Sequence, residues 1–146
     1  MVVMRAVFLL FLTLALVGCR EVRVNTAASG IAYSPGSNAI EVIRNQRTLD
    51  ASGIKAPFNF SKEFAVILFM GPHKETGYTQ FTESIRANIQ RVRVVAFERQ
   101  SLEGGAASKD YRTYTCWRVP NSAYRAGSIL DVVTPSGDLI VSTTLR

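Results

Sequence analysis

The sequence predicts a mostly β fold, a small antiparallel sandwich or open barrel of six to seven strands with one or two short helical turns. Three observations support this fold class. Apolar, β-branched runs of strand length recur, turn-forming residues separate them about every ten residues, and no long amphipathic helix is indicated. The chain has 146 residues, of which 47% are apolar and 19% charged, which excludes a disordered tail and leaves room for one domain.

Residues 1–18 are typical of a secretory signal peptide. Arg5 provides a positive charge, and residues 6–17 (AVFLLFLTLALV) form an apolar run whose one polar residue is Thr13. As a helix, this run would cover roughly 18 Å, less than a hydrocarbon core of about 30 Å. A buried core helix is the alternative, but the run is apolar all round and lacks a capping residue before it.

The end of this run, Leu16-Val17-Gly18-Cys19, resembles the lipobox of bacterial lipoproteins. The resemblance implies cleavage before Cys19 and a diacylglycerol on its sulfur, followed by a further acyl chain on its amine. Two or more chains hold a protein stably on a membrane. Arg20 stands where an Asp would resemble an inner-membrane retention signal, so we expect an outer-membrane anchor facing the periplasm. The alternative is a plain signal peptide with Cys19 free or disulfide-bonded.

Residues 19–38 are predicted to be the lipidated N-terminus and a flexible tether, and residues 39–146 the β domain. The tether is predicted from small, polar, turn-prone segments at 25–30 and 34–38.

The β domain is predicted to contain one helical turn and a series of short strands. Residues 46–51 can form the turn before Gly53, and residues 64–70 read as a central strand that is apolar on both faces. Gly104-Gly105 marks a flexible loop over 101–109, and residues 135–138 suit a hairpin turn. The predicted strands are 39–44, 64–70, 78–86, 89–99, 111–119, 128–134 and 139–145.

The segment between the most apolar strand and the next one is the candidate interaction loop. Gly77 suits a positive φ, and Tyr78 can pin the loop to the core. Binding residues are concentrated in loops that a rigid scaffold positions. An ordinary hairpin loop with no binding role is the alternative. The candidate residues are His73, Lys74, Glu75, Thr76, Gly77 and Tyr78.

The sequence offers no recognisable catalytic set, cofactor-binding motif or metal site. Glycine-rich phosphate motifs, HExxH and paired CxxC motifs are missing. With Cys19 acylated, Cys116 has no partner in the chain, and nothing places it near His73, the one histidine. Glu98 and Glu103 are the closest pair of carboxylates. We therefore expect no catalytic residue, no cofactor and no metal.

The net charge of +6 bears on solubility and on the partners that the protein can attract, and not on its fold. A periplasmic protein does not normally meet nucleic acid, so we expect none. Anionic lipid headgroups or an acidic protein are better candidates. Arg91, Arg93 and Arg99 come closest to a cluster, and a solvated face is the alternative.

The stretch from about residue 40 to residue 124 resembles the PrcB C-terminal-like domain family. The resemblance rests on the order of its segments: a strand and turn at 40–49, Phe58-Asn59-Phe60-Ser61-Lys62-Glu63, an apolar strand ending in Gly71, Thr76-Gly77-Tyr78-Thr79, a strand at 92–99 and Arg118-Val119-Pro120. The family is named for an accessory subunit of a cell-surface protease complex. It implies a small secreted or lipid-anchored domain without an assigned activity.

We therefore expect a non-enzymatic, lipid-anchored module that docks on an envelope protein complex, for which a protease is one candidate. An alternative is a peptidase inhibitor, because Thr76-Gly77-Tyr78 is weakly similar to one wedge loop of chagasin-type inhibitors. The inhibitory contacts would then come from the loop Pro72 to Tyr78.

Overall fold

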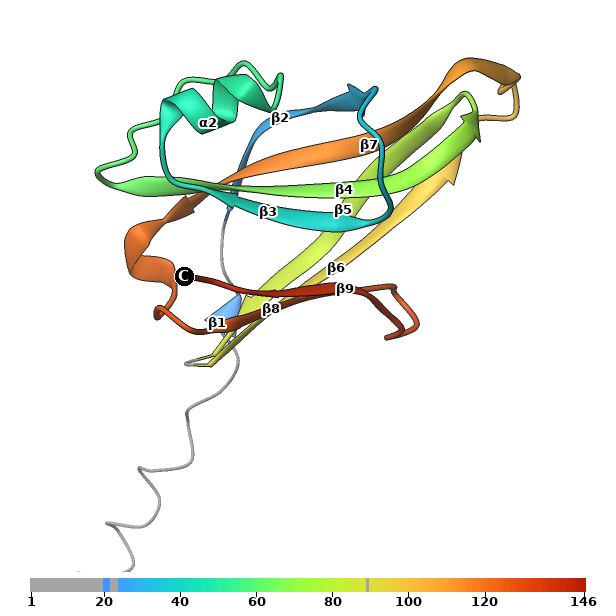
Figure 1. Cartoon of the computed structure of the whole chain (residues 1–146). Helices are drawn as coiled ribbons and strands as arrows, with labels where there is room; N and C mark the ends of the chain where they lie inside the picture. Colours follow the sequence, from blue (N-terminus) through green and yellow to red (C-terminus); the bar gives the residue numbers. More distant parts are fainter. Residues whose placement is uncertain (1–19, 22–23, 89) are drawn as a thin grey trace, which may run out of the picture.

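Two β-sheets pack face to face in the computed structural model, which describes residues 20–21, 24–88 and 90–146 (Figure 1). One sheet has the strand order β1-β5-β6-β8-β9 and the other β2-β7-β4-β3. This arrangement confirms the predicted β sandwich; β6 and β8 run parallel, and the other pairs are antiparallel. The elements are β1 (Arg20–Glu21), β2 (Asn25–Ala32), β3 (Ala39–Ile43), α2 (Gln46–Ala51), β4 (Glu63–Glu75), β5 (Tyr78–Ala87), β6 (Arg91–Gln100), β7 (Ala106–Pro120), η1 (Asn121–Ala123), β8 (Ile129–Val133) and β9 (Leu139–Thr144).

Strand β4 is buried on both faces, as its continuous apolar run predicts. It lies between β7 and β3 in the four-stranded sheet. Alternate residues from Phe64 to Met70 face the other sheet, whereas Ala65, Ile67 and Phe69 face the layer that contains α2. A strand in this position has to be apolar on both sides because each face packs against a separate cluster.

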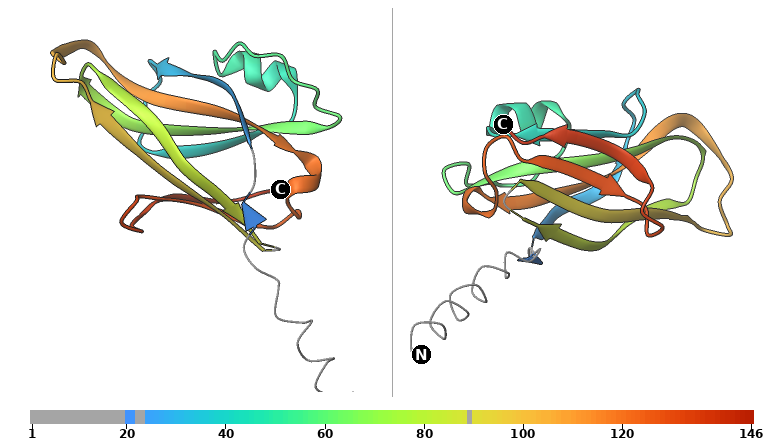
Figure 2. Two further views of the ribbon diagram at one scale, coloured as in Figure 1. Left: turned by 180° about the vertical axis from the view of Figure 1, so that it is seen from behind. Right: turned by 90° about the horizontal axis from the view of Figure 1, so that it is seen from below.

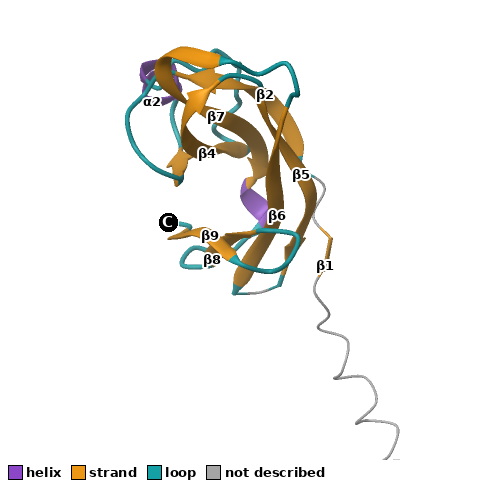
Figure 3. Cartoon of the chain, turned by 90° about the vertical axis from the view of Figure 1, so that its right-hand side faces the viewer, coloured by secondary structure: helices purple, strands orange, loops and turns teal. Residues whose placement is uncertain are grey.

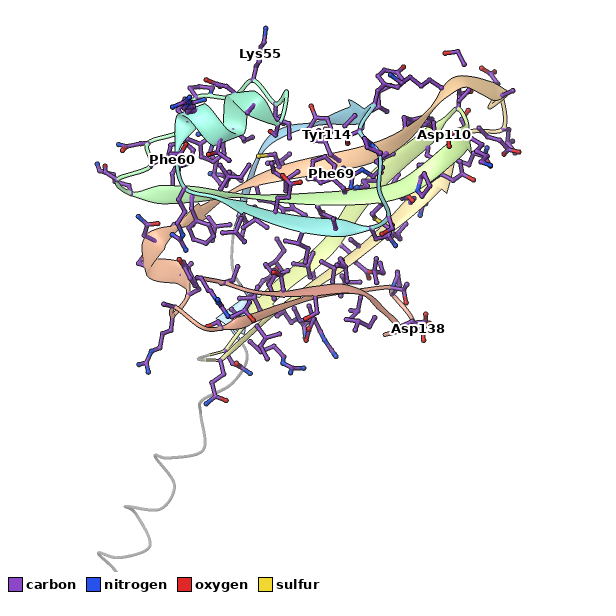
Figure 4. The ribbon with its side chains drawn as sticks, viewed as in Figure 1. Lys55, Phe60, Phe69, Asp110, Tyr114 and Asp138 are labelled. Atoms are coloured by element: carbon purple, nitrogen blue, oxygen red, sulfur yellow. The ribbon has the colours of Figure 1, made fainter. Side chains whose placement is uncertain are left out.

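Helix α2 and the segment after it cover the outer face of the four-stranded sheet (Figure 3). The side chain of Asn45 caps the helix by accepting a hydrogen bond from the Thr48 amide at 2.8 Å. Leu49 and Ile54 are buried against the sheet. In Figure 4, Phe69 and Tyr114 lie at the sheet below α2, and Lys55 points away from the protein. The predicted helical turn at 46–51 is confirmed.

The space between the sheets is apolar where β5 and β6 approach β1. The buried cluster there includes Phe64, Trp117, Leu130 and Leu145. A small cavity of about 30 Å³ with a wholly apolar lining remains within it. This packing holds the two sheets together at the end where the described chain begins.

The predicted tether is wrong for residues 25–38. Asn25–Ala32 forms β2 along the edge of β7. Gly30 lies close to the Tyr114 ring, which a Cβ at that position would meet at 3.4 Å. The Arg112 guanidinium holds the following connection by donating to Ser37 O at 3.0 Å and to Ser34 Oγ at 2.7 Å. The folded domain therefore begins before residue 39.

The signal peptide at 1–18 and the lipidation site Cys19 lie outside the described residues. In the part of the chain that the structure does describe, no helix has the length and apolar character needed to span a membrane.

Two strands are longer than predicted, at the expense of the loops beside them. β4 continues through Glu75, so His73, Lys74 and Glu75 are strand residues and the connection to β5 is Thr76-Gly77 alone. β7 begins at Ala106, inside the loop predicted over 101–109. Pro72, which lacks an amide donor, is accommodated within β4 because it lies at an irregularity where the β4–β7 register shifts.

Candidate functional site

The turn between β4 and β5 is tightly joined to the loop between β6 and β7. Gly77 has φ +94°, which confirms the positive φ expected for it. The Thr76 amide donates to Gly105 O at 2.7 Å, and the Gly105 amide donates to Thr76 Oγ1 at 2.9 Å. The Ser101 amide donates to Gly77 O at 3.0 Å. These two connections form one unit, which we call the hairpin end.

An open groove of about 140 Å³ lies at the hairpin end. Ile31 and Tyr33 are its most exposed apolar residues, with 48% and 56% of their surface accessible. The ring of Tyr33 meets Tyr111 edge to face at 6.4 Å between centroids, and the Lys109 ammonium lies 5.7 Å from the Tyr33 ring centroid. The lining consists of Ile31, Tyr33, Thr76, Gly77, Tyr78, Ala107, Ser108, Lys109 and Tyr111.

A polar network fills the space between the sheets behind this groove. His73 Nε2 lies 2.8 Å from Glu98 Oε1, and the two side chains are only 11% and 14% exposed. Thr113 Oγ1 donates to the same Glu98 oxygen at 2.5 Å. Gln80 Nε2 lies 3.0 Å from both the carbonyl oxygen and Oγ1 of Thr113. Each of these groups has a partner, as burial of polar groups requires.

The network also fixes the two tyrosines that line the groove. The His73 ring stacks on Tyr78 with 3.9 Å between centroids and 12° between planes. Tyr111 lies 5.5 Å from the same imidazole and donates its hydroxyl to Glu75 O at 2.8 Å. Glu98 thus orients His73, and His73 supports the floor of the groove.

The order of groups in this network is not that of a hydrolase triad. A triad places the imidazole between a carboxylate and a nucleophile. Here the carboxylate of Glu98 lies between the imidazole of His73 and the hydroxyl of Thr113. The Tyr111 hydroxyl donates to a backbone carbonyl. The geometry supports a positioned, buried network better than an activated nucleophile.

Cys116 lies apart from this network. It is fully buried in the cluster on the α2 side of the sheet, whereas Thr113 belongs to the opposite face of β7. Burial raises the pKa of its thiol to about 11, against a smaller opposing effect of the Arg118 charge. A thiol with a raised pKa is a poor nucleophile at neutral pH.

The structure separates the predicted loop residues into two groups. Thr76, Gly77 and Tyr78 line the groove, and His73 supports it from within. Lys74 and Glu75 are exposed on β4, where the Glu75 carboxylate accepts from Gln100 Nε2 at 2.9 Å.

Sequence reasoning missed the contribution of β2 to the groove. Ile31 and Tyr33 lie within the predicted tether, and their only signal is a pair of apolar residues spaced two apart, as on one face of a strand. It also missed that the carboxylate of Glu98 meets His73. The available signal was the spacing of Glu98, which follows Val94 and Ala96 at intervals of two and so falls on the same inward face of the strand.

Comparisons with known proteins leave the function to be argued from this geometry. No family model matches the chain, and neither a curated protein nor a solved structure matches it. Among the described residues, no three His, Cys, Asp or Glu side chains gather in a way that could hold a metal ion.

Proposed function

We propose that this protein is a lipid-anchored, non-catalytic interaction module whose groove at the hairpin end binds a protein partner of the cell envelope. The observation that carries the proposal is the exposure of Ile31 and Tyr33 beside an open groove. Exposed aromatic and aliphatic side chains around a hollow are typical of the centre of a protein interface. The buried network behind the groove keeps its wall rigid before a partner arrives.

The groove lies beside an outer strand. Among the strands that the structure describes, β2 is at the edge of its sheet and pairs only with β7. An extended segment of a partner can add to such an edge through backbone hydrogen bonds and place a side chain in the adjacent hollow. The occupant that fits is thus an extended protein segment with an apolar side chain.

The anchor in this proposal is a lipid on Cys19, in the periplasmic face of the outer membrane. It is supported by the lipobox-like residues Leu16 to Cys19 and by the apolar run before them. The resemblance to the PrcB C-terminal-like family supports an accessory role, with a protease complex as one possible partner.

Site-specific cross-linking tests the groove. A photo-reactive residue replaces Tyr33 in the full-length, membrane-attached protein, and a matched variant carries it in place of Arg47, which is exposed on α2. We expect one defined adduct from position 33, none from position 47, and loss of the adduct when Ile31→Asp is added. Equal adducts from both positions, or none from position 33, would overturn the proposal.

Peptidase inhibition is the second proposal. Its support is the place of Thr76-Gly77 at the tip of an antiparallel hairpin that borders the groove. Against it, Pro72 to Glu75 are held in β4 and do not project as a loop. Dose–response assays against papain-like peptidases decide it, and a flat response removes it.

A further inference from the structure

The outer face of the five-stranded sheet carries exposed arginines close to the beginning of the described chain. Arg86 of β5 and Arg93 of β6 lie directly opposite each other in the strand register, and Arg91 lies two residues before Arg93. All three are exposed and line a shallow groove of about 430 Å³ with Ser84, Asn88 and Val95. We call these three arginines the basic face.

Acidic partners neutralise only part of the basic face. Arg91 Nη1 lies 3.0 Å from Asp131 Oδ2, and that carboxylate also accepts from Ser142 Oγ at 2.7 Å. Within the described residues, Arg86 and Arg93 form no ion pair. Glu21 lies opposite Arg86 in the β1–β5 register, without a salt bridge to it. Arg93 also lies opposite Asp131 in the β6–β8 register, but that carboxylate is paired with Arg91. Arg86 and Arg93 therefore face each other as like charges, and an external anion would relieve their repulsion.

The chain enters the domain beside the basic face. β1 begins at Arg20, which pairs with Ala87, and Glu21 pairs with Arg86 (Figure 2). Cys19 directly precedes β1 in the sequence, and two residues of chain reach at most about 7 Å, so a lipid on Cys19 could not lie far from the position opposite Arg86. The hairpin end lies at the other end of β5, about 30 Å away over its ten residues.

We propose that the basic face binds the phosphate groups of an anionic phospholipid surface and so orients the domain on the membrane that anchors it. Guanidinium groups bind phosphate oxygens through paired, charge-assisted hydrogen bonds. The face is open, cationic and adjacent to the lipid site, whereas the groove at the hairpin end is left free for its protein partner. The orientation rests on the proposed lipid anchor, although the phosphate site itself does not require it.

Arginine footprinting on vesicles tests this inference. The full-length protein is placed in vesicles of phosphatidylcholine alone or of phosphatidylcholine with phosphatidylglycerol, treated with a phenylglyoxal reagent and analysed by mass spectrometry. We expect Arg86 and Arg93 to react several-fold more slowly in the anionic vesicles and to regain their rate at high salt. Arg47, on the α2 layer, is the internal reference and should react equally in both.

Paired variants sharpen the test. In Arg86→Gln with Arg93→Gln, the affinity of the basic face for anionic headgroups should fall by about fivefold for each arginine removed, so Arg91 should lose its protection. Arg47→Gln should leave it unchanged. Equal reaction of Arg86, Arg93 and Arg47 in both vesicle types overturns the inference. Protection that appears only when an acidic envelope protein is added also overturns it, in favour of a protein partner.

The same digest separates the two proposals. The mass of the N-terminal peptide reports whether Cys19 carries lipid. A lipidated protein without protection of Arg86 and Arg93 removes the phosphate site and leaves the anchor. An unlipidated protein with protection removes the anchor and leaves the phosphate site.

Discussion

The interior between the two sheets differs in chemistry at its two ends. At the hairpin end it holds a histidine, a carboxylate, a threonine hydroxyl and a glutamine amide, which are linked in that order through successive hydrogen bonds. Near β1 it holds a cluster of apolar side chains that includes Phe64 and Trp117. β4, β5, β6 and β7 border both ends, so the difference arises from side chains rather than from the backbone.

This difference shows how a small sandwich can divide its tasks. The apolar end stabilises the fold in proportion to the apolar surface that it removes from water, and this hydrophobic effect does not depend on the direction of the contacts. The polar end gains a fixed geometry, because hydrogen bonds hold His73 and the tyrosines of the groove in one arrangement. The partner groove lies at the end with the fixed geometry, and the exposed arginines lie outside the apolar end.

Removal of the Glu98 carboxylate has the largest expected effect. Glu98→Ala leaves His73 Nε2 and Thr113 Oγ1 without their acceptor in a space that is nearly buried. We expect a loss of about 3 kcal/mol in the free energy of unfolding, measured by urea denaturation. Glu98→Gln should lose less because it keeps an acceptor. Glu103→Ala, in the exposed loop, is the control; an equal loss there would contradict a special role for the hairpin end.

Cys116 is a buried ionisable group that lies outside this network, and its effect on stability depends on pH. Its thiol pKa is raised to about 11, so folding favours the neutral form. The stabilisation is complete below the ordinary thiol pKa of 9.0 and is lost as the pH rises through the folded pKa of about 11. We expect Cys116 to account for a loss of about 2 to 3 kcal/mol between those limits.

Chemical denaturation across this pH range checks the prediction for Cys116. The Cys116→Ala variant should be less stable at pH 7 because it leaves a small void, but its stability should fall less steeply with pH. If the free energy of unfolding falls equally steeply with pH in the parent and in Cys116→Ala, ionisation of this thiol does not contribute to the pH dependence, and the prediction is wrong.

Local patterns in the sequence predicted the apolar strands correctly, and long-range pairing explains what they missed. The run at 64–70 and the hairpin at 128–145 are visible in the sequence because each depends on neighbouring residues. β2 is not visible in this way, because its small and polar residues give no strand signal of their own and pair with β7, which is distant in the sequence.

The candidate site was predicted in part for the same reason. Gly77 and Tyr78 were found because turn chemistry is local. The contact between His73 and Glu98 joins residues 25 positions apart. It depends on the β5–β6 register and on the irregular pairing of β4 at His73, which no periodicity in the sequence encodes.

A substitution that disturbs the packing of the two turns at the hairpin end should cause a moderate loss of stability. A Cβ at Gly104 would lie 2.5 Å from Thr76 O, whereas a Cβ at Gly105 meets nothing within 4 Å. Gly104→Ala should therefore push the loop away from the Thr76-Gly77 turn and lower stability by about 2 kcal/mol. Gly105→Ala is the matched control and should stay within about 0.5 kcal/mol of the parent. The same loss in both would mean that loop flexibility, not contact, is responsible.

The basic face should show the smallest effect on stability, with the opposite sign. Arg86 and Arg93 repel each other across the β5–β6 pair, so Arg86→Gln with Arg93→Gln should stabilise the lipid-free protein by about 0.5 kcal/mol at low salt. The gain should vanish at high salt, because both side chains are exposed and their repulsion is screened. Thermal unfolding at two salt concentrations measures it, with Arg47→Gln as the control. If the double variant is clearly less stable than the parent, the two arginines stabilise the fold and the prediction is wrong. If it is more stable, the arginines lower the stability of the fold, which is consistent with a role in binding a partner.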